Sequence, residues 1–173
     1  MVKPLDVKPG DVFAFGGTKG FFSWLIRIAT WNPVTHVAIV SHMDKDGVPV
    51  LIESTTLYDK KSGVQENSLY ARLDAYKGLG RAWWCPLTTQ TRTALSVPDM
   101  QAFLREQVGK QYDYRQVVGV ALNSVPLLQR CLNQADYNRM FCPELVSSAL
   151  KAGGVIPKEW GDSHLTPEGL ISY

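Results

Sequence analysis

Residues 35–54 read THVAIVSHMDKDGVPVLIES and predict a β-hairpin. Two runs rich in valine and isoleucine, 36–43 and 48–54, are typical of β-strands. Between them, Asp44-Lys45-Asp46-Gly47 has the Asp-Gly ending that favours a tight turn between antiparallel strands. We therefore expect an antiparallel sheet that is built around this hairpin.

The register of the hairpin decides which side chains meet. If Met43 pairs with Val48, Ala38 faces Glu53, and His36 lies diagonally across on the same face, within about 8 Å. Glu53 could then orient the imidazole of His36. A one-residue slip would turn Glu53 to the opposite face, and the two residues could also form an ordinary exposed pair.

A second informative segment is FCPELV, residues 141–146, where a loop passes into an amphipathic helix. Pro143 suits the first helical position, Glu144 favours the first turn, and Gly153-Gly154 end the helix. We therefore place Cys142 at the positive end of a helix dipole, an environment that favours the nucleophilic thiolate. A free cysteine can equally be a small buried hydrophobe, so this motif does not decide by itself.

We expect the other two cysteines to be structural residues. Cys85 lies in an aromatic run that predicts a strand, and Cys131 lies in a leucine-rich helical stretch. Three cysteines at unrelated spacings do not form a disulfide framework. A reactive thiol fits a reducing compartment, or one in which it stays unpaired.

The remaining elements complete an α+β pattern, with strands grouped early and helices grouped late. Ser96-Val97-Pro98-Asp99 predicts a capping box that opens a helix. We expect an antiparallel sheet packed against helices, including the Cys142 helix, in a single domain spanning residues 1–173. The further predicted elements are strands at 11–15 and 81–87 and helices at 20–30, 69–76 and 115–122.

Composition narrows the choice of partners. A chain of 173 residues that is 45% hydrophobic can bury a real core, and a net charge of +2 with scattered basic residues predicts no nucleic-acid partner. The N-terminus lacks a signal peptide and the longest apolar stretches are too short to span a bilayer, so a soluble cytoplasmic protein is expected. Because His36, His42 and His164 show no paired spacing with cysteines, no metal site is expected.

A cysteine at a helix start, a histidine at a strand start and a carboxylate on the next strand match the nucleophile, base and orienting group of thiol hydrolases. The order of motifs resembles that of the circularly permuted papain-like hydrolases of the NlpC superfamily, in the YiiX-like branch, which is related in fold to the lecithin retinol acyltransferases. In that family the histidine strand precedes the cysteine helix. The segments that carry the resemblance are Gly10-Asp11-Val12-Phe13, Thr35-His36-Val37-Ala38-Ile39-Val40, Glu53-Ser54, Gly109-Lys110-Gln111-Tyr112-Asp113-Tyr114, Phe141-Cys142-Pro143-Glu144-Leu145-Val146 and Leu165-Thr166-Pro167-Glu168-Gly169-Leu170.

The resemblance implies a permuted papain-like fold and a cysteine hydrolase that needs no cofactor. Cys142 would attack the substrate, His36 would take and return the proton, and Glu53 would orient the imidazole. Tyr112 either lines the cleft and binds substrate, as the resemblance suggests, or belongs to the core. Pro143 departs from the family, in which serine is common here, because proline brings neither a hydroxyl nor a backbone donor.

The resemblance also implies a substrate class. Peptidoglycan stem peptides are the leading expectation and lipid amides or esters, cleaved or used for acyl transfer, are the alternative. A wall hydrolase without an export signal would need delivery by a phage or a secretion system. The scaffold could also serve as a non-catalytic binding or structural module. The oligomeric state is left open by the sequence.

Overall fold

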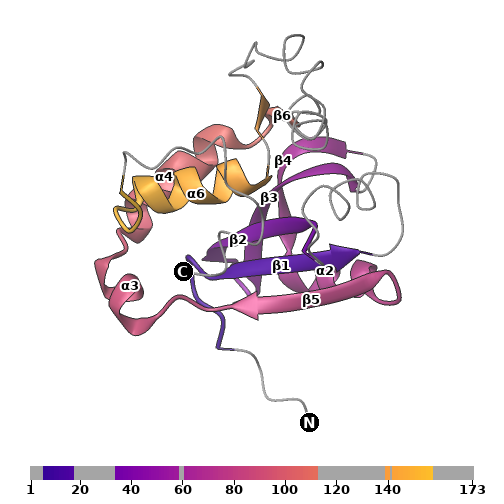
Figure 1. Cartoon of the computed structure of the whole chain (residues 1–173), viewed down its shortest axis with the longest axis horizontal. Coiled ribbons are helices and arrows are strands. Elements are labelled where there is room, and N and C mark those ends of the chain that lie inside the picture. The colour runs from indigo at the N-terminus through magenta and orange to yellow at the C-terminus, as the bar shows by residue number, and fades with distance from the viewer. Residues whose placement is uncertain (1–5, 18–33, 59–60, 113–138, 141, 158–173) are drawn as a thin grey trace, which may run out of the picture.

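The computed structural model describes residues 6–17, 34–58, 61–112, 139–140 and 142–157. In this part of the chain, one antiparallel sheet contains five strands in the order β4-β3-β2-β1-β5 (Figure 1). Helices pack against both faces of the sheet, so the expected α+β class is confirmed. The strands are β1 (Val12–Gly17), β2 (His36–Met43), β3 (Pro49–Tyr58), β4 (Lys61–Ser68) and β5 (Gly80–Cys85).

Two helices, α4 (Val97–Gln107) and α6 (Cys142–Ala152), lie side by side on one face of the sheet (Figure 1). The shorter α2 (Leu69–Tyr76) packs on the other face, and α3 (Thr89–Ala94) connects β5 to α4. A small parallel pair consists of β6 (Gln111–Tyr112) and β7 (Arg139–Met140). None of the helices in the described ranges is long and apolar enough to cross a membrane.

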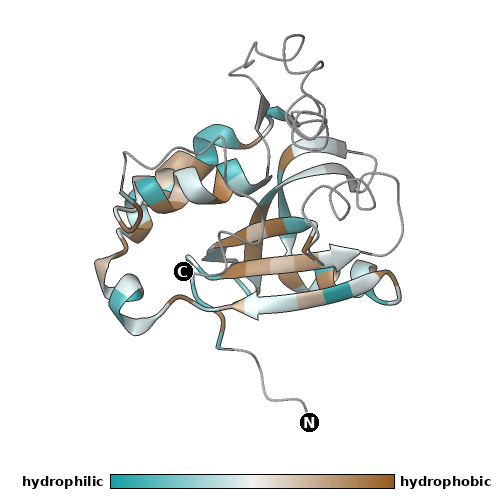
Figure 2. Cartoon of the chain, in the orientation of Figure 1, coloured by the Kyte–Doolittle hydropathy of each residue, from teal (hydrophilic) through white to brown (hydrophobic). Residues whose placement is uncertain are grey.

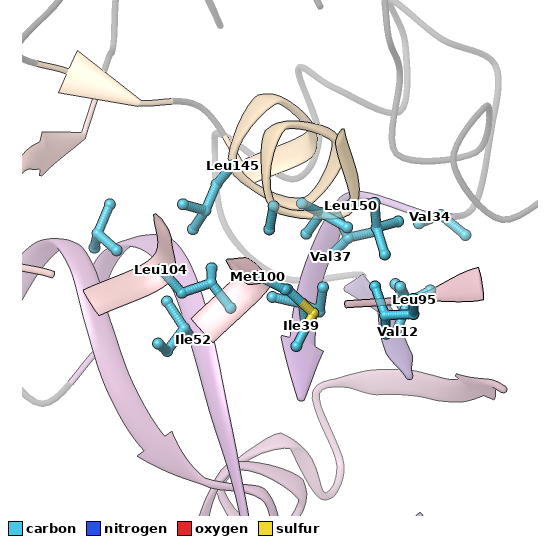
Figure 3. Packing of buried hydrophobic residues seen from close by; sticks show 14 residues of the cluster. Val12, Val34, Val37, Ile39, Ile52, Leu95, Met100, Leu104, Leu145 and Leu150 are labelled. Carbon is cyan, nitrogen blue, oxygen red and sulfur yellow. The ribbon is translucent and has the colours of Figure 1, made fainter. Parts of the chain in front are cut away.

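The first core lies between the sheet and the α4–α6 pair. Val37 and Ile39 of β2 and Ile52 of β3 are fully buried there. In Figure 3, Leu145 and Leu150 of α6 point toward these strands. Each such side chain contributes about 2 kcal/mol when it leaves water. The apolar stripe expected for the helix is confirmed, since its four members are all buried: Leu145, Val146, Ala149 and Leu150.

The second core lies on the opposite face, where the alternate residues of the same strands meet α2. Phe13 and Phe15 of β1 and Leu51 of β3 pack there with Leu69 of α2. Figure 2 shows hydrophobic residues along the central strands β1 and β2, as expected for strands covered on both faces. A polar residue on either face of these strands must therefore find its partners inside the protein.

The hairpin turn differs from the expected one. Met43 pairs with Pro49 instead of Val48. The cause is Asp44, whose backbone N–H donates to the Val48 carbonyl and whose carboxylate Oδ1 accepts the Val48 N–H at 2.8 Å. Val48 therefore belongs to the turn, and β3 begins one residue later.

A β-bulge restores the expected pairing further along the hairpin. The register shifts between Val40 and His42, and Ile39 pairs with Ile52. Continuing this pairing by one residue places Ala38 opposite Glu53, as expected, although the pairing next to the turn was wrong. The bulge adds one residue to β2, which offsets the residue that the turn takes from β3.

Strand β4 was not predicted. Its sequence, KSGVQENS, contains one apolar residue, Val64, so it lacks the alternation of a half-buried strand. It forms because it pairs with β3 along most of its length, and β3 itself continues to Tyr58, beyond its expected end. Gly63 permits a close approach on the outer side of β4, since a Cβ atom there would lie 2.2 Å from the Lys110 carbonyl oxygen.

The helix predicted at 69–76 is α2, and the strands predicted at 11–15 and 81–87 are β1 and β5 with shifted ends. Ser96 is the N-cap of α4, but its hydroxyl donates to the Asp99 carboxylate at 2.5 Å and makes no cap hydrogen bond to the backbone. The capping box is therefore replaced by a contact between side chains. The helices predicted at 20–30 and 115–122, Cys131, His164 and the segment 165–170 lie outside the described residues.

Candidate functional site

The candidate site is built around a hydrogen bond between His36 and Glu53. His36 is the first residue of β2, and its Nε2 lies 2.5 Å from Glu53 Oε2 on β3. The Glu53 side chain is fully buried and the His36 side chain is 13% exposed. The expected contact is present, and the alternative of an ordinary exposed pair is wrong because the carboxylate has no access to water.

Two residues that the sequence analysis missed hold the other carboxylate oxygen. Glu53 Oε1 accepts hydrogen bonds from Asn67 Nδ2 on β4 and from Arg72 Nε on α2, both at 2.8 Å. The signal for Arg72 was present in the sequence. It lies in the helical stripe of Leu69, Leu73 and Tyr76, where a charged residue among apolar ones indicates a buried partner.

Aromatic rings surround this ion pair. The Arg72 guanidinium carbon lies 5.3 Å from the centre of the Phe15 ring and 5.5 Å from that of Tyr76. Phe15 also lies beside His36, with 5.7 Å between the ring centres. Burial raises the pKa of Tyr76. The rings exclude water from the charges and strengthen their interaction.

The protonation state of Glu53 follows from these contacts. Burial by itself would raise the pKa of its carboxyl group, but hydrogen bonds and positive charge from His36 and Arg72 outweigh burial and lower it to about 2. Glu53 is therefore a carboxylate throughout the physiological range. A carboxylate in this place can accept the imidazole N–H and stabilise an imidazolium.

This lowered pKa predicts a loss of stability in acid. Unfolded Glu53 takes up a proton near its ordinary value of 4.5, whereas the folded protein resists protonation down to about 2. The contribution to the free energy of unfolding is therefore fully present above pH 4.5 and is lost as the pH falls toward 2, by about 3 kcal/mol. Urea unfolding of the unmodified protein and Glu53→Gln at several pH values checks this. The stability difference should shrink toward pH 2, and a constant difference would contradict the assignment.

Cys142 is the first residue of α6, as expected for a nucleophile at a helix start. Its side chain lies outside the described residues. The strand just before it, β7, pairs in parallel with β6, with Met140 opposite Tyr112. The start of α6 is therefore held close to β6.

The segment before β6 is tied to the sheet near Glu53. Val64 of β4 exchanges backbone hydrogen bonds with Gly109 and Lys110, at 2.9 and 2.8 Å. Val64 is paired with Ser54, the residue after Glu53. The C-terminal end of α6 supports the same direction for this helix. Gly153, just after α6, accepts a hydrogen bond from the backbone N–H of Ser96, which precedes α4 and so lies at the opposite end of α4 from Gly109. Cys142 thus begins its helix at the end of the sheet where β2 starts.

The alternation of side chains along the strands limits how the Cys142 thiol can reach His36. His36 and Glu53 lie on the sheet face that α2 covers, whereas the body of α6 covers the other face. A thiol at the start of α6 must therefore approach the imidazole past the end of β2. The position of His36 as the first residue of β2 suits this approach.

The structure gives less information on the role of Tyr112 than on that of Cys85. Tyr112 lies in β6, but its side chain is outside the described residues, so its role stays a prediction. Cys85 is half-buried, and burial raises the pKa of its thiol, which disfavours the thiolate. In the described ranges, no group of three or more His, Cys, Asp or Glu side chains is arranged to hold a metal ion.

Comparison with known proteins supports the fold. The crystal structure of metalloprotein yiiX from Escherichia coli O157:H7 matches with a TM-score of 0.52 over 84% of this chain. The two folds are similar. Sequence identity is 14%, and the chain spans 66% of the length of that protein. No protein-family model and no curated protein matches the sequence.

Proposed function

We propose that this chain is a cysteine hydrolase that cleaves an amide or ester bond by acyl transfer. The observation that carries the proposal is the buried hydrogen bond between His36 and the ionised Glu53. Cys142 supports it, because it starts a helix at the same end of the sheet. Nucleophile, base and orienting group are the three parts of a thiol-hydrolase triad.

In the proposed mechanism, each ring nitrogen of His36 has its own task. Nε2 is engaged by Glu53, so Nδ1 would exchange the proton with the thiol. The Cys142 thiolate attacks the carbonyl carbon, and His36 then donates its proton to the leaving amine or alcohol as the thioester forms. Water attacks the thioester, His36 accepts a proton from it, and the acid is released with restoration of the thiol.

The tetrahedral oxyanion needs a hydrogen-bond donor. The backbone N–H of Cys142 belongs to the first turn of α6, where backbone N–H groups lack partners within the helix. One such donor is worth about 3 kcal/mol of transition-state stabilisation. Pro143 follows directly and has no N–H, so the next position cannot add a backbone donor.

The substrate we favour is a peptide amide of the bacterial cell wall, on the resemblance to NlpC-type hydrolases. A lipid amide or ester is the alternative, through the related lecithin retinol acyltransferases. Large apolar side chains that the described surface exposes, such as Tyr70, Leu79 and Val108, come from different elements. They supply no amphipathic helix of the kind that holds an enzyme on a bilayer.

Purified protein should release stem-peptide fragments from defined muropeptides and leave phospholipid vesicles unchanged. Mass spectrometry of the products from both incubations measures this directly. Cys142→Ala is the matched control, because fragment release must depend on that thiol. Release of fatty acid or acyl transfer, with muropeptides untouched, would assign the enzyme to the lipid class. No reaction with either substrate and a slowly alkylated Cys142 would favour a non-catalytic module.

Because yiiX is a metalloprotein, the His36–Glu53 pair of this chain is a candidate position for a metal ion. Both Glu53 oxygens already accept hydrogen bonds, and the Arg72 Nε lies 2.8 Å from one of them. A cation placed there would face the guanidinium charge directly. The arrangement therefore disfavours a metal ion at this pair.

A further inference from the structure

Arg72 is held in one orientation by its surroundings. Its side chain is 9% exposed, and its guanidinium lies against the rings of Phe15 and Tyr76. Its Nε donates a hydrogen bond to Glu53 Oε1 at 2.8 Å. Burying an arginine costs a large desolvation free energy. An apolar side chain in its place would carry no such cost.

The carboxylate of Glu53 is divided between two sets of partners. Oε1 faces Arg72 and Asn67, and Oε2 faces His36. A carboxylate on a single hydrogen bond could turn about its terminal torsion, which is broad in glutamate. With Oε1 held by two donors, Oε2 has one direction available to it, and that direction leads to the imidazole.

We propose that Arg72 is the positioning residue of this site, which holds Glu53 ionised and turned so that Oε2 serves His36, and which moderates the pull of Glu53 on the imidazolium. The inference rests on the proposed function, because a tuned imidazole matters only if His36 transfers protons. The Arg72 guanidinium and a protonated His36 both interact with the single negative charge of Glu53. The imidazolium is therefore stabilised less than in an isolated His–Glu pair and releases its proton more readily.

The other described groups around Glu53 and His36 carry no charge in the physiological range that could take the role of Arg72. Asn67 and Gln65 on β4 and Phe15 on β1 carry no charge, and Gln65 is paired directly opposite Glu53. Tyr76 on α2 titrates, but its raised pKa keeps it neutral in the physiological range. Within the described residues, Arg72 is the permanent charge in contact with the carboxylate.

The test is an NMR titration of His36 in the full chain, in which the imidazole resonances report protonation without any substrate. Arg72→Met removes the charge while keeping an unbranched side chain, and it should raise the His36 midpoint by about one pH unit. Glu53→Gln should move the midpoint in the opposite direction. Arg72→Lys keeps the charge and should leave the midpoint close to that of the unmodified protein.

Activity gives the second readout. Arg72→Met should lower kcat by about 10-fold with little change in KM, because the imidazolium then releases its proton to the leaving group less readily while the substrate site is intact. The alkaline limb of its pH profile should move with the His36 midpoint. Arg72→Lys should recover part of the loss in kcat.

Arg92→Met is the matched control. Arg92 of α3 pairs with the buried carboxylate of Asp11, the residue before β1, so this change also breaks an arginine–carboxylate pair beside the same sheet. It should lower the melting temperature without moving the His36 midpoint. An equal shift in Arg92→Met would mean that the effect is general loosening of the fold, and would overturn the proposal.

An unchanged or lowered His36 midpoint in Arg72→Met would also overturn it. If Arg72→Met does not fold, the unmodified protein still decides, since the Glu53 carboxyl resonance should stay that of a carboxylate well below pH 4 and a midpoint near 4.5 would contradict the role of Arg72. Absence of any Cys142-dependent reaction would refute the proposed function instead. The titration results would stand in that case, so the two failures are distinguishable.

Discussion

Replacing Cys142 by alanine should abolish turnover and leave the fold intact. No other group in the proposed mechanism can form the thioester, so the loss should reach the detection limit, and loss of a triad member typically costs several orders of magnitude. Activity on the identified substrate, together with circular dichroism and a thermal melt, measures both parts.

The other cysteines provide matched controls for this change. Cys85→Ala and Cys131→Ser should remain active apart from modest packing losses, because burial raises the pKa of Cys85 and neither residue starts the α6 helix. Iodoacetamide at mildly acidic pH should label Cys142 first. An active Cys142→Ala protein, or faster labelling of another cysteine, would overturn the assignment.

Replacing His36 by alanine should be nearly as damaging as the loss of Cys142, since the thiol would lose both its base and the proton donor for the leaving group. Glu53→Gln should be less damaging. Glutamine keeps the shape of the side chain but removes the charge that stabilises the imidazolium. Steady-state kcat and kcat/KM of the variants give the expected order.

The three groups should act as a unit, so their effects should not add. Cys142→Ala combined with His36→Ala should be no worse than Cys142→Ala alone. Thr93→Ala on the exposed α3 provides a control far from the site. Near-normal turnover in His36→Ala would exclude it as the base, and full additivity of the double variant would show that the residues act separately.

The local elements of the site were predictable because their signals are local. The hairpin has strand formers around an Asp-Gly turn, and α6 has its proline, acidic residue and apolar stripe at the expected places. Strand β4 lacks such a signal. Its polar residues adopt an extended backbone through pairing with β3, which no short window of sequence contains.

The contact between His36 and Glu53 was predicted from a register that was wrong at the turn. Asp44 draws Val48 into the turn, and the bulge after Val40 compensates for it. Each event shifts the pairing by one residue, and either event alone would have turned Glu53 to the opposite face. Sequence patterns cannot resolve two shifts that cancel.

By itself the sequence determined the local elements in which the proposed catalytic residues lie. His36 at the head of a strand, Glu53 on the next strand and Cys142 at the head of a helix all follow from neighbouring residues. The tertiary structure decided that Glu53 is buried, ionised and shared with Arg72 and Asn67. The pKa of a buried carboxyl depends on the balance between desolvation and the partners that the fold brings to it, and here those partners come from β2, β4 and α2.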